Sequence, residues 1–163
     1  MKYYYTMMNS PVGDITLVAD EENLCAIYWQ NQKPDSRKFP DLEKNDKSRV
    51  LRSAALQLSS YFMGRTQKFD IPLRPVGTDF QEKVWRALRS IKYGKTVSYG
   101  EIARKIGNPK AVRAVGAAIG KNPLSIIVPC HRVIGSNGKL TGFAGGLETK
   151  EFLLNMERGV SQS

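Results

Sequence analysis

Helix start signals follow one another closely in the second half of the chain. Thr78 with Gln81, and Ser98 with Glu101, are capping-box pairs, in which the first side chain and the one three residues later each bind the other's backbone N–H. Apolar residues recur at helical spacing after each pair. The pattern predicts two amphipathic helices, with the buried positions Phe80, Val84, Trp85, Leu88 and Ile91 in the first and Ile102, Ala103 and Ile106 in the second.

A third helix is expected directly after the second. Asn108 is a favourable N-cap and Pro109 suits the first helical position, so we expect this helix to extend to Gly120. Two short helices separated by the glycine-containing tripeptide 107–109 are typical of a helix-turn-helix, whose second helix usually enters a DNA groove. An ordinary helical hairpin is the alternative interpretation.

The outward face of this third helix indicates how it would meet DNA. If Val112, Val115 and Ile119 point into the core, the outward residues are Lys110, Arg113, Gly116 and Ala117. Small side chains flanked by positive charge permit a close approach to DNA, whereas long polar readers such as Asn and Gln are missing. We therefore expect DNA binding without sequence-specific base readout.

The first 75 residues have a different pattern. The runs KYYYTMM, ITLVAD and LCAIYWQ predict a small antiparallel meander, the polar residues 31–46 a surface loop, and residues 48–63 an amphipathic helix that ends at Gly64. The proline-containing stretch KFDIPLRPVG is expected to be an extended linker. The predicted fold class is α+β, with a small strand-rich domain over residues 1–75 and a mainly helical domain with a helix-turn-helix over residues 76–163.

The charge of the chain is concentrated in its second half. The 163 residues have a net charge of +10; there are 11 basic and 9 acidic side chains up to Pro75, and 14 and 6 from Val76 onward. A solubilising surface is one interpretation. The asymmetry favours a polyanionic partner, and nucleic acid is the commonest one.

Cysteine and histidine are scarce. The chain has Cys25, Cys130 and a single histidine, His131, which are too few for a zinc site and form no CxxC pattern, so we expect reduced thiols, no metal and no cofactor. No apolar run approaches the roughly 20 residues of a membrane span, and the first residues lack the apolar core of a secretory signal. We expect a cytoplasmic protein.

The stretch IIVPCHRVIG, residues 126–135, places Cys130 beside His131. Its first part, IIVPC, is expected to be a short apolar strand that Pro129 ends. A thiol with a pKa of about 8.5 is mostly protonated at neutral pH, so a nucleophilic cysteine needs a base. His131 can be that base, and Glu157, at the edge of the apolar face of a final helix, can orient the imidazole. Because neighbouring side chains of a strand point to opposite faces, we expect a turn or a water to connect His131 to Cys130. The alternative is a buried structural cysteine.

The ordered motifs of the second half resemble a known family. GNPKAVRAVGAAIGKNP, then IIVPCHRVIG with the signature PCHRV, then GFAGGLETKEFLLNMERG are similar to the O6-alkylguanine-DNA alkyltransferases, also called methylated-DNA-protein-cysteine methyltransferases. The resemblance implies a DNA repair protein that flips an alkylated base out of duplex DNA and transfers the alkyl group from O6 of guanine to its own cysteine, once per molecule. O4 of thymine is a second candidate position from which the alkyl group could be removed. The resemblance also implies a monomer that associates with the nucleoid when bound to DNA.

The resemblance assigns roles to individual residues. Cys130 is the alkyl acceptor, His131 acts through water, and Glu157 completes the relay. Asn122 braces the active-site turn, and Tyr99 lies near the target phosphate and approaches guanine N3. Arg113 fills the space left by the extruded base. The substrate-binding residues are Phe143, Ala144, Val133 and Gly145, where Phe143 walls the pocket and main-chain groups of Cys130, Val133 and Ala144 read the guanine edge.

Two positions depart from some relatives, and two other functions are open. Phe143 stands where others have tyrosine and Ala144 where others have serine, which puts side-chain hydroxyl contacts and alkyl-size preference in question.

A Cys-His-Glu hydrolase would use the same three residues to form a thioester and would turn over. A protein that senses alkylated DNA without repairing it is the other alternative, although such relatives lack the acceptor cysteine that this chain has.

Overall fold

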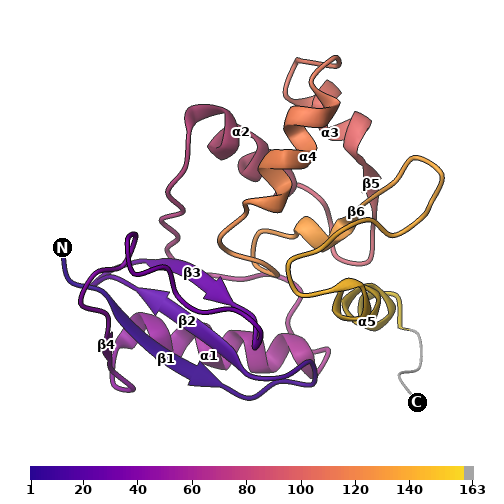
Figure 1. Ribbon diagram of the computed structural model, residues 1–163. Helices are drawn as coiled ribbons and strands as arrows, with labels where there is room; N and C mark the ends of the chain where they lie inside the picture. Colours follow the sequence, from indigo (N-terminus) through magenta and orange to yellow (C-terminus); the bar gives the residue numbers. More distant parts are fainter. Residues whose placement is uncertain (160–163) are drawn as a thin grey trace. The chain divides into compact units, whose positions relative to one another are not determined.

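Three short strands form the expected meander at the start of the chain (Figure 1). In this computed structural model, β1 (Tyr4–Met8), β2 (Ile15–Ala19) and β3 (Leu24–Tyr28) pair antiparallel in sequence order. A fourth strand, β4 (Glu43–Lys44), pairs parallel with β1, so the sheet order is β3-β2-β1-β4. The expectation of an uninterrupted loop over residues 31–46 was wrong at this point, because an exposed two-residue edge strand has no apolar alternation to reveal it.

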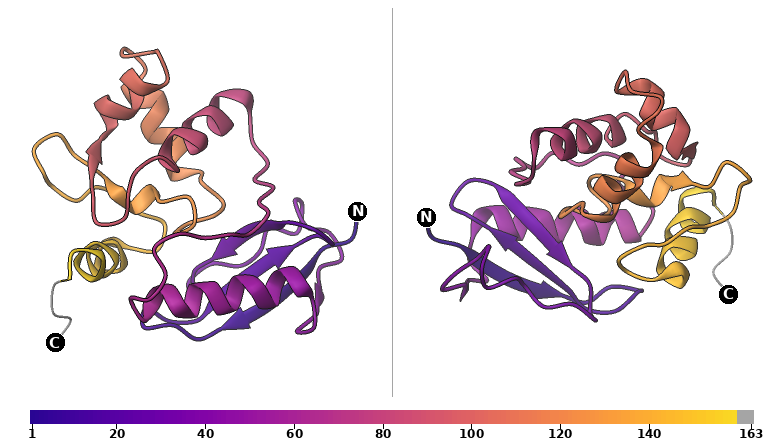
Figure 2. Two further views of the ribbon diagram at one scale, coloured as in Figure 1. Left: turned by 180° about the vertical axis from the view of Figure 1, so that it is seen from behind. Right: turned by 45° about the horizontal axis from the view of Figure 1, so that its top comes forward.

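The helix α1 (Arg49–Phe62) covers one face of this sheet, as both views in Figure 2 show. Ser48 is its N-cap, with Oγ accepting the Leu51 N–H at 3.3 Å, and Gly64 beyond its end has a φ of +74°. The buried face of the helix consists of Leu51, Ala54, Leu58 and Tyr61. This is the amphipathic helix that the spacing predicts.

The stretch expected to be a linker is partly attached to the sheet. Leu24 donates its N–H to the carbonyl of Pro72 at 2.8 Å, and Arg74 donates its N–H to the carbonyl of Leu24 at 2.9 Å. The Arg74 Nε also lies 2.7 Å from the Asp20 carboxylate. The chain therefore runs alongside β3 as far as Arg74, because backbone groups in an extended proline-containing segment still find partners at a sheet edge.

The structure describes residues 1–159, and they divide into two compact units, Met1–Pro75 and a unit that begins at Val76. The second unit contains α2 (Asp79–Leu88), α3 (Tyr99–Lys105), α4 (Val112–Gly120) and α5 (Leu147–Glu157). The protein is thus α+β, as predicted. Within residues 1–159, no helix combines the length and the apolar character needed to cross a membrane.

Both predicted capping boxes form, at Thr78 for α2 and Ser98 for α3. The Trp85 indole N–H on α2 donates to the Ala118 carbonyl on α4 at 2.8 Å, which fixes one helix against the other. A hydrogen bond from a buried indole to backbone satisfies both groups. The helices α3 and α4 thus pack beside α2 in the arrangement expected for a helix-turn-helix.

The helix α4 begins three residues later than expected. Asn108 donates its N–H to the Ala103 carbonyl at 2.9 Å, and Gly107, with a φ of +79°, donates to Arg104 at 3.0 Å. These two bonds form a Schellman motif at the end of α3, so Asn108 closes one helix instead of capping the next. Val112, predicted to be inward, is 41% exposed at the first turn of α4.

Two short parallel strands complete the second unit. β5 (Val97–Ser98) pairs with β6 (Val133–Ile134), with Val97 opposite Val133. This pairing, which the sequence pattern does not reveal, holds the start of α3 beside the residue that follows the Cys-His-Arg tripeptide.

Candidate functional site

Cys130 lies at the start of a turn and not at the end of a strand. The 3₁₀ turn η1 (Cys130–Arg132) follows a buried irregular segment, so the expected strand IIVPC was wrong. Ile126 has a φ of +77°, and Pro129 has φ −81° and ψ 67° with the Cys130 N–H bonded to the Val128 carbonyl at 2.8 Å, an inverse γ-turn. Successive turns therefore lead into the cysteine. Apolar composition alone does not distinguish such turns from a strand.

Asn122 braces this segment from inside. Its amide Nδ2 donates to the Val128 carbonyl at 2.9 Å, and its Oδ1 accepts the Leu124 N–H at 3.0 Å. One side chain thus bridges both ends of the turn that precedes Pro129. Such a bridge stabilises a backbone containing a strained residue with positive φ.

The Cys130 thiol is buried and opens onto a small cavity. Cys130 is 6% exposed, and its Sγ lies 4.0 Å from the Ser125 hydroxyl. The cavity has a volume of about 90 Å³ and is lined by Ile119, Gly120, Asn122, Ser125, Cys130, Gly142, Phe143 and Ala144. Burial raises the pKa of this thiol, and hydrogen bonds from Asn122 and Ser125 and the charge of Lys150 oppose the shift. At neutral pH the free thiol is protonated and needs a base.

His131 and Glu157 form a fully buried pair. The imidazole Nε2 lies 2.6 Å from the Glu157 Oε2, and both side chains are completely excluded from solvent. Burial lowers the pKa of His131, against the effect of Glu157, so the imidazole is neutral at pH 7. An ionised carboxylate only accepts, so Nε2 carries the proton and Nδ1 keeps a free lone pair. Within residues 1–159, Nδ1 has no hydrogen-bond partner.

Arg132 holds Glu157 in the ionised state. Its Nε and Nη2 donate to the two carboxylate oxygens at 2.8 and 3.0 Å, a bidentate pair, and Nη1 donates to the Ile91 carbonyl at 2.7 Å. The backbone N–H of Gly94 adds a fourth bond to Glu157 at 3.2 Å. A carboxylate with this many donors stays charged despite its burial.

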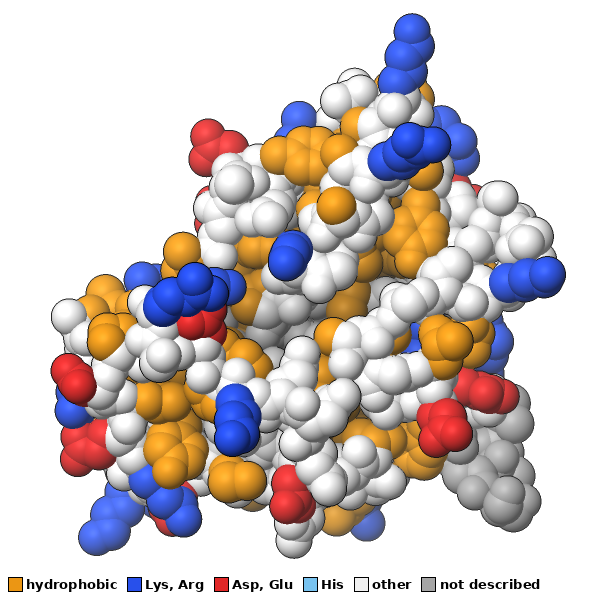
Figure 3. All heavy atoms as spheres, in the orientation of Figure 1, with side chains coloured by type: hydrophobic (Ala, Val, Ile, Leu, Met, Phe, Trp, Pro, Cys, Tyr) orange, Lys and Arg blue, Asp and Glu red, His pale blue; other side chains and the backbone are white. Residues whose placement is uncertain are grey.

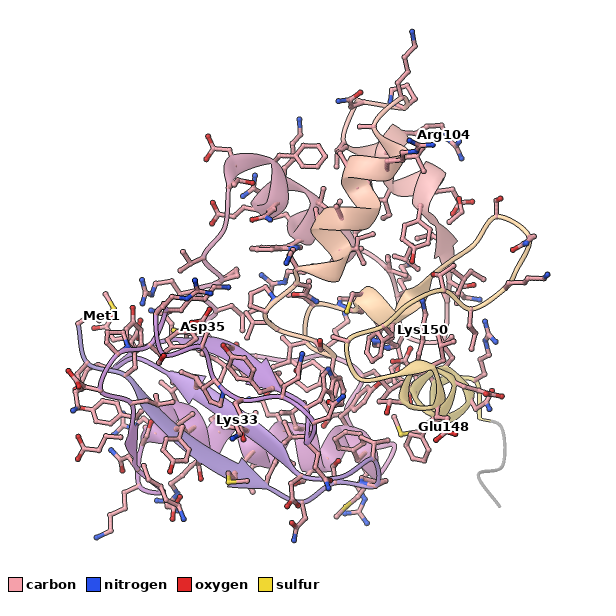
Figure 4. All side chains as sticks on the ribbon, in the orientation of Figure 1. Met1, Lys33, Asp35, Arg104, Glu148 and Lys150 are labelled. Atoms are coloured by element: carbon pink, nitrogen blue, oxygen red, sulfur yellow. The ribbon has the colours of Figure 1, made fainter. Side chains whose placement is uncertain are left out.

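Lys150, on α5, is a second buried cation of this region. It is 1% exposed, and its Nζ donates to the Val133 carbonyl at 2.7 Å and to the carbonyl and hydroxyl of Thr141, both at 3.4 Å. Figure 4 labels its side chain, which points from α5 into the unit. The Thr141 hydroxyl is also hydrogen-bonded to the hydroxyl of Tyr99. Burial lowers the pKa of Lys150, and Cys130 opposes the shift.

The predicted DNA-facing residues lie on and just before α4. Lys110, Arg113 and Ala117 are exposed and Gly116 is partly buried. Figure 3 shows Lys and Arg side chains over α3 and α4, and Figure 4 labels Arg104 among them. A Cβ on Gly116 would lie 3.8 Å from the Tyr99 ring, an ordinary contact. Packing inside the unit therefore does not require a glycine here, although glycine costs a helix about 1 kcal/mol relative to alanine.

The structure brings most of the predicted catalytic and substrate-binding residues together around the turn. Cys130, His131 and Glu157 are neighbours at the turn, with Asn122 bracing it, and Phe143 and Ala144 line the cavity. Tyr99 connects to this region through Thr141. Val133 and Gly145 are not among the described residues that line the cavity, and the Val133 carbonyl accepts from Lys150.

Sequence reasoning missed Arg132, Lys150, Ser125 and Thr141. Two signals could have found the cations. Arg132 interrupts an otherwise apolar run, and Lys150 shares one face of α5 with Leu153, Leu154 and Glu157 at spacings of three, four and seven residues. A charge at an apolar position indicates a buried partner. Ser125 and Thr141 carry no such signal.

Potential metal ligands do not gather at this site. Within residues 1–159, no group of three or more His, Cys, Asp or Glu side chains is placed to hold a metal ion. Cys25 and Cys130 are both buried free thiols.

Known proteins resemble both units. Residues 79–159 match the family model "6-O-methylguanine DNA methyltransferase, DNA binding domain", and residues 3–75 match "6-O-methylguanine DNA methyltransferase, ribonuclease-like domain". The methylated-DNA-protein-cysteine methyltransferase of Methanosarcina acetivorans is 51% identical over 154 residues, covering 94% of this chain and 97% of that one. The constitutive one of Bacillus subtilis is 44% identical over 157 residues, covering 95% of each.

Solved structures agree with the sequence comparison. The crystal structure of Mycobacterium tuberculosis OGT in complex with DNA has a TM-score of 0.88 and 43% identity, covering 98% of this chain and 94% of that one. The Mycobacterium tuberculosis O6-methylguanine methyltransferase likewise has a TM-score of 0.88 at 43% identity, covering 99% of this chain and 96% of that one. With both family models matched in order and a buried Cys-His-Glu arrangement at the signature PCHRV, the chain belongs to the methylated-DNA-protein-cysteine methyltransferase family.

Proposed function

We propose that this protein repairs DNA by transferring a methyl or other alkyl group from O6 of guanine to the Sγ of Cys130. The observation that carries the proposal is the buried acceptor thiol, placed at a cavity beside a neutral imidazole whose basic nitrogen is free. The unit from Val76 onward would bind duplex DNA and accept the alkyl group, as a monomer in the DNA-containing cytoplasm. O4 of thymine is a second candidate donor.

Proton removal from Cys130 follows from the tautomer of His131. With Nε2–H donated to Glu157, a water between Nδ1 and Sγ can pass the thiol proton to the imidazole. Glu157 then stabilises the imidazolium, and the positive charge of Arg132 opposes this effect. The resulting thiolate is stabilised in turn by the charge of Lys150.

Alkyl transfer is an in-line displacement at the alkyl carbon. The Sγ–carbon bond forms while the carbon–O6 bond breaks, and its electron pair moves into the guanine ring, where a hydrogen bond from Tyr99 to N3 offsets the charge. The proton lost by the thiol balances the one that guanine regains. A thioether has no leaving group, and the sequence from Val76 onward has no second cysteine, so each molecule reacts once.

Base flipping is the step that the DNA-facing helix supports. A base alkylated on O6 is inside the stack, and extruding it costs a few kcal/mol. Arg113, exposed on α4, would enter the space that the base leaves and offset part of this cost. Main-chain groups near Ala144 would then read the guanine edge, with Phe143 as one wall of the cavity. The Val133 carbonyl, which already accepts from Lys150, would contribute only if that bond were exchanged.

Mass spectrometry tests the proposal directly. After incubation with an oligonucleotide duplex containing O6-methylguanine, the peptide that contains Cys130 gains the mass of one methyl group, in an amount equal to the methyl lost from DNA. A Cys-His-Glu hydrolase would instead turn over and leave Cys130 unmodified. Unmodified protein with the substrate still methylated contradicts the proposal.

Arg113→Ala tests the flipping step. We expect the variant to repair O6-methylguanine in duplex DNA at least tenfold more slowly, because the extruded state loses its support, whereas its reaction with free O6-benzylguanine stays within about twofold of wild type. Single-turnover rates on both substrates are the measurement. Arg113→Lys keeps the positive charge but not the planar guanidinium group. Its repair rate therefore separates the effect of side-chain shape from that of charge. Equal losses on both substrates would contradict the assigned role.

A further inference from the structure

Thr141 joins two groups on which the proposed reaction depends. Its hydroxyl is hydrogen-bonded to the hydroxyl of Tyr99, 42 residues away in the sequence, and lies 3.4 Å from the Nζ of Lys150. Lys150 is a buried ammonium whose charge acts on Cys130. The side chain of Thr141 thus connects the tyrosine to the cation beside the acceptor thiol.

Either hydroxyl of the Thr141–Tyr99 pair can donate by geometry, and the buried end of this chain of hydrogen bonds leaves the Thr141 proton free to do so. An ammonium group only donates, so the Thr141 oxygen accepts from Lys150. The single proton of the Thr141 hydroxyl is then available for the Tyr99 oxygen, which leaves the Tyr99 proton free to be donated outward. Bonds aligned in this way polarise one another, and a charged donor at the end strengthens the effect.

We propose that Thr141 is a positioning residue that orients the Tyr99 hydroxyl as a donor to N3 of the alkylated guanine and connects it to the charge of Lys150. This inference rests on the proposed function. As the carbon–O6 bond breaks, negative charge develops on guanine; the Tyr99 hydroxyl donates to N3, Thr141 donates to the Tyr99 oxygen, and Lys150 donates to Thr141. One buried cation then stabilises both the attacking thiolate and the departing base.

Thr141→Val separates this role from packing, because valine keeps the branched shape and removes the hydroxyl. We expect transfer from O6-methylguanine in duplex DNA to slow about tenfold, the effect of one lost hydrogen bond of roughly 1.4 kcal/mol. Thr141→Ser, the matched control, keeps the hydroxyl and should react within about twofold of wild type.

A modified substrate supplies the readout that a structural role would not move. In 3-deaza-O6-methylguanine, a C–H group replaces N3, so Tyr99 has no acceptor on the base. Wild type and Thr141→Val should therefore transfer methyl from this substrate at equal rates within about twofold, under single-turnover conditions. Equal slowing of the variant on both substrates, or no slowing on either, overturns the inference.

The wild-type protein serves as the separate test of the underlying function. If it transfers no methyl from O6-methylguanine, the proposed function fails before any variant is compared. If it does transfer, the ratio of the transfer rates on the two substrates is compared between wild type and Thr141→Val. This comparison tests only the role of Thr141. Thermal denaturation of the variants should show unchanged folding, since Thr141 is only partly buried.

Discussion

Replacing Cys130 with serine is expected to abolish alkyl transfer and to leave the binding of alkylated duplex DNA within about threefold of wild type. Serine has nearly the same shape, so the turn and the cavity are preserved, but a hydroxyl is far less acidic than a thiol and His131 cannot generate the nucleophile. Methyl transfer is followed by mass spectrometry, and binding to a duplex containing O6-methylguanine by fluorescence anisotropy at fixed salt.

The other cysteine provides the matched control. Cys25 is also a buried free thiol, but it lies in the N-terminal unit, where Asp20 and Arg74 surround it. Cys25→Ser should therefore transfer one methyl group per molecule, as wild type does. If Cys130→Ser lost DNA binding together with transfer, the cysteine would be structural; if it still transferred, the acceptor would be a different residue.

Glu157→Gln is expected to destabilise the second unit by about 3–5 kcal/mol, because it leaves the buried Arg132 without its counter-charge. Glutamine keeps the size of the side chain but accepts at only one oxygen, so it cannot satisfy both His131 and the two donors of Arg132. The free energy of unfolding is measured by urea denaturation, monitored through Trp85 in a Trp29→Phe background so that the signal reports on this unit.

Two variants distinguish the loss of charge pairing from a general effect on α5. Glu151→Gln changes an exposed carboxylate on the same helix and should alter stability by no more than about 0.5 kcal/mol. Glu157→Gln combined with Arg132→Met removes both charges and should recover a large part of the lost stability. A Glu157→Gln protein as stable as wild type would show that the pair contributes nothing to stability.

Local sequence patterns predicted most of the helices and strands. They failed where a residue's role depends on the path of the backbone. The capping boxes at Thr78 and Ser98 form because each needs only residues three positions apart. The start of α4 could not be read in the same way, since Asn108 suits an N-cap by composition but is used by the Schellman motif of α3. The same residue type serves either end of a helix, and the backbone path decides between them.

In the candidate site, too, some features could be predicted from local sequence and others depend on the tertiary structure. PCHRV and its flanking motifs identify Cys130 and His131 from sequence alone, because the chemistry of a thiol beside an imidazole is local. The sequence predicted an indirect connection between the two, with Glu157 orienting the imidazole. In the structure Nε2 of His131 lies 2.6 Å from Glu157, 26 residues away, and Nδ1 is left as the basic nitrogen.

The amino-acid sequence by itself determined the family and most of the helices and predicted the acceptor, since each depends on residues close together in the chain. Tertiary structure alone decided which charges act on that acceptor. Arg132 and Lys150 have side chains that usually lie in solvent, and here both are buried, with Arg132 bound to Glu157 of α5 and Lys150 bound to the carbonyl of Val133. Burial removes the competing water, so each cation must bind a specific partner, and those partners lie too far along the chain for any local pattern to identify.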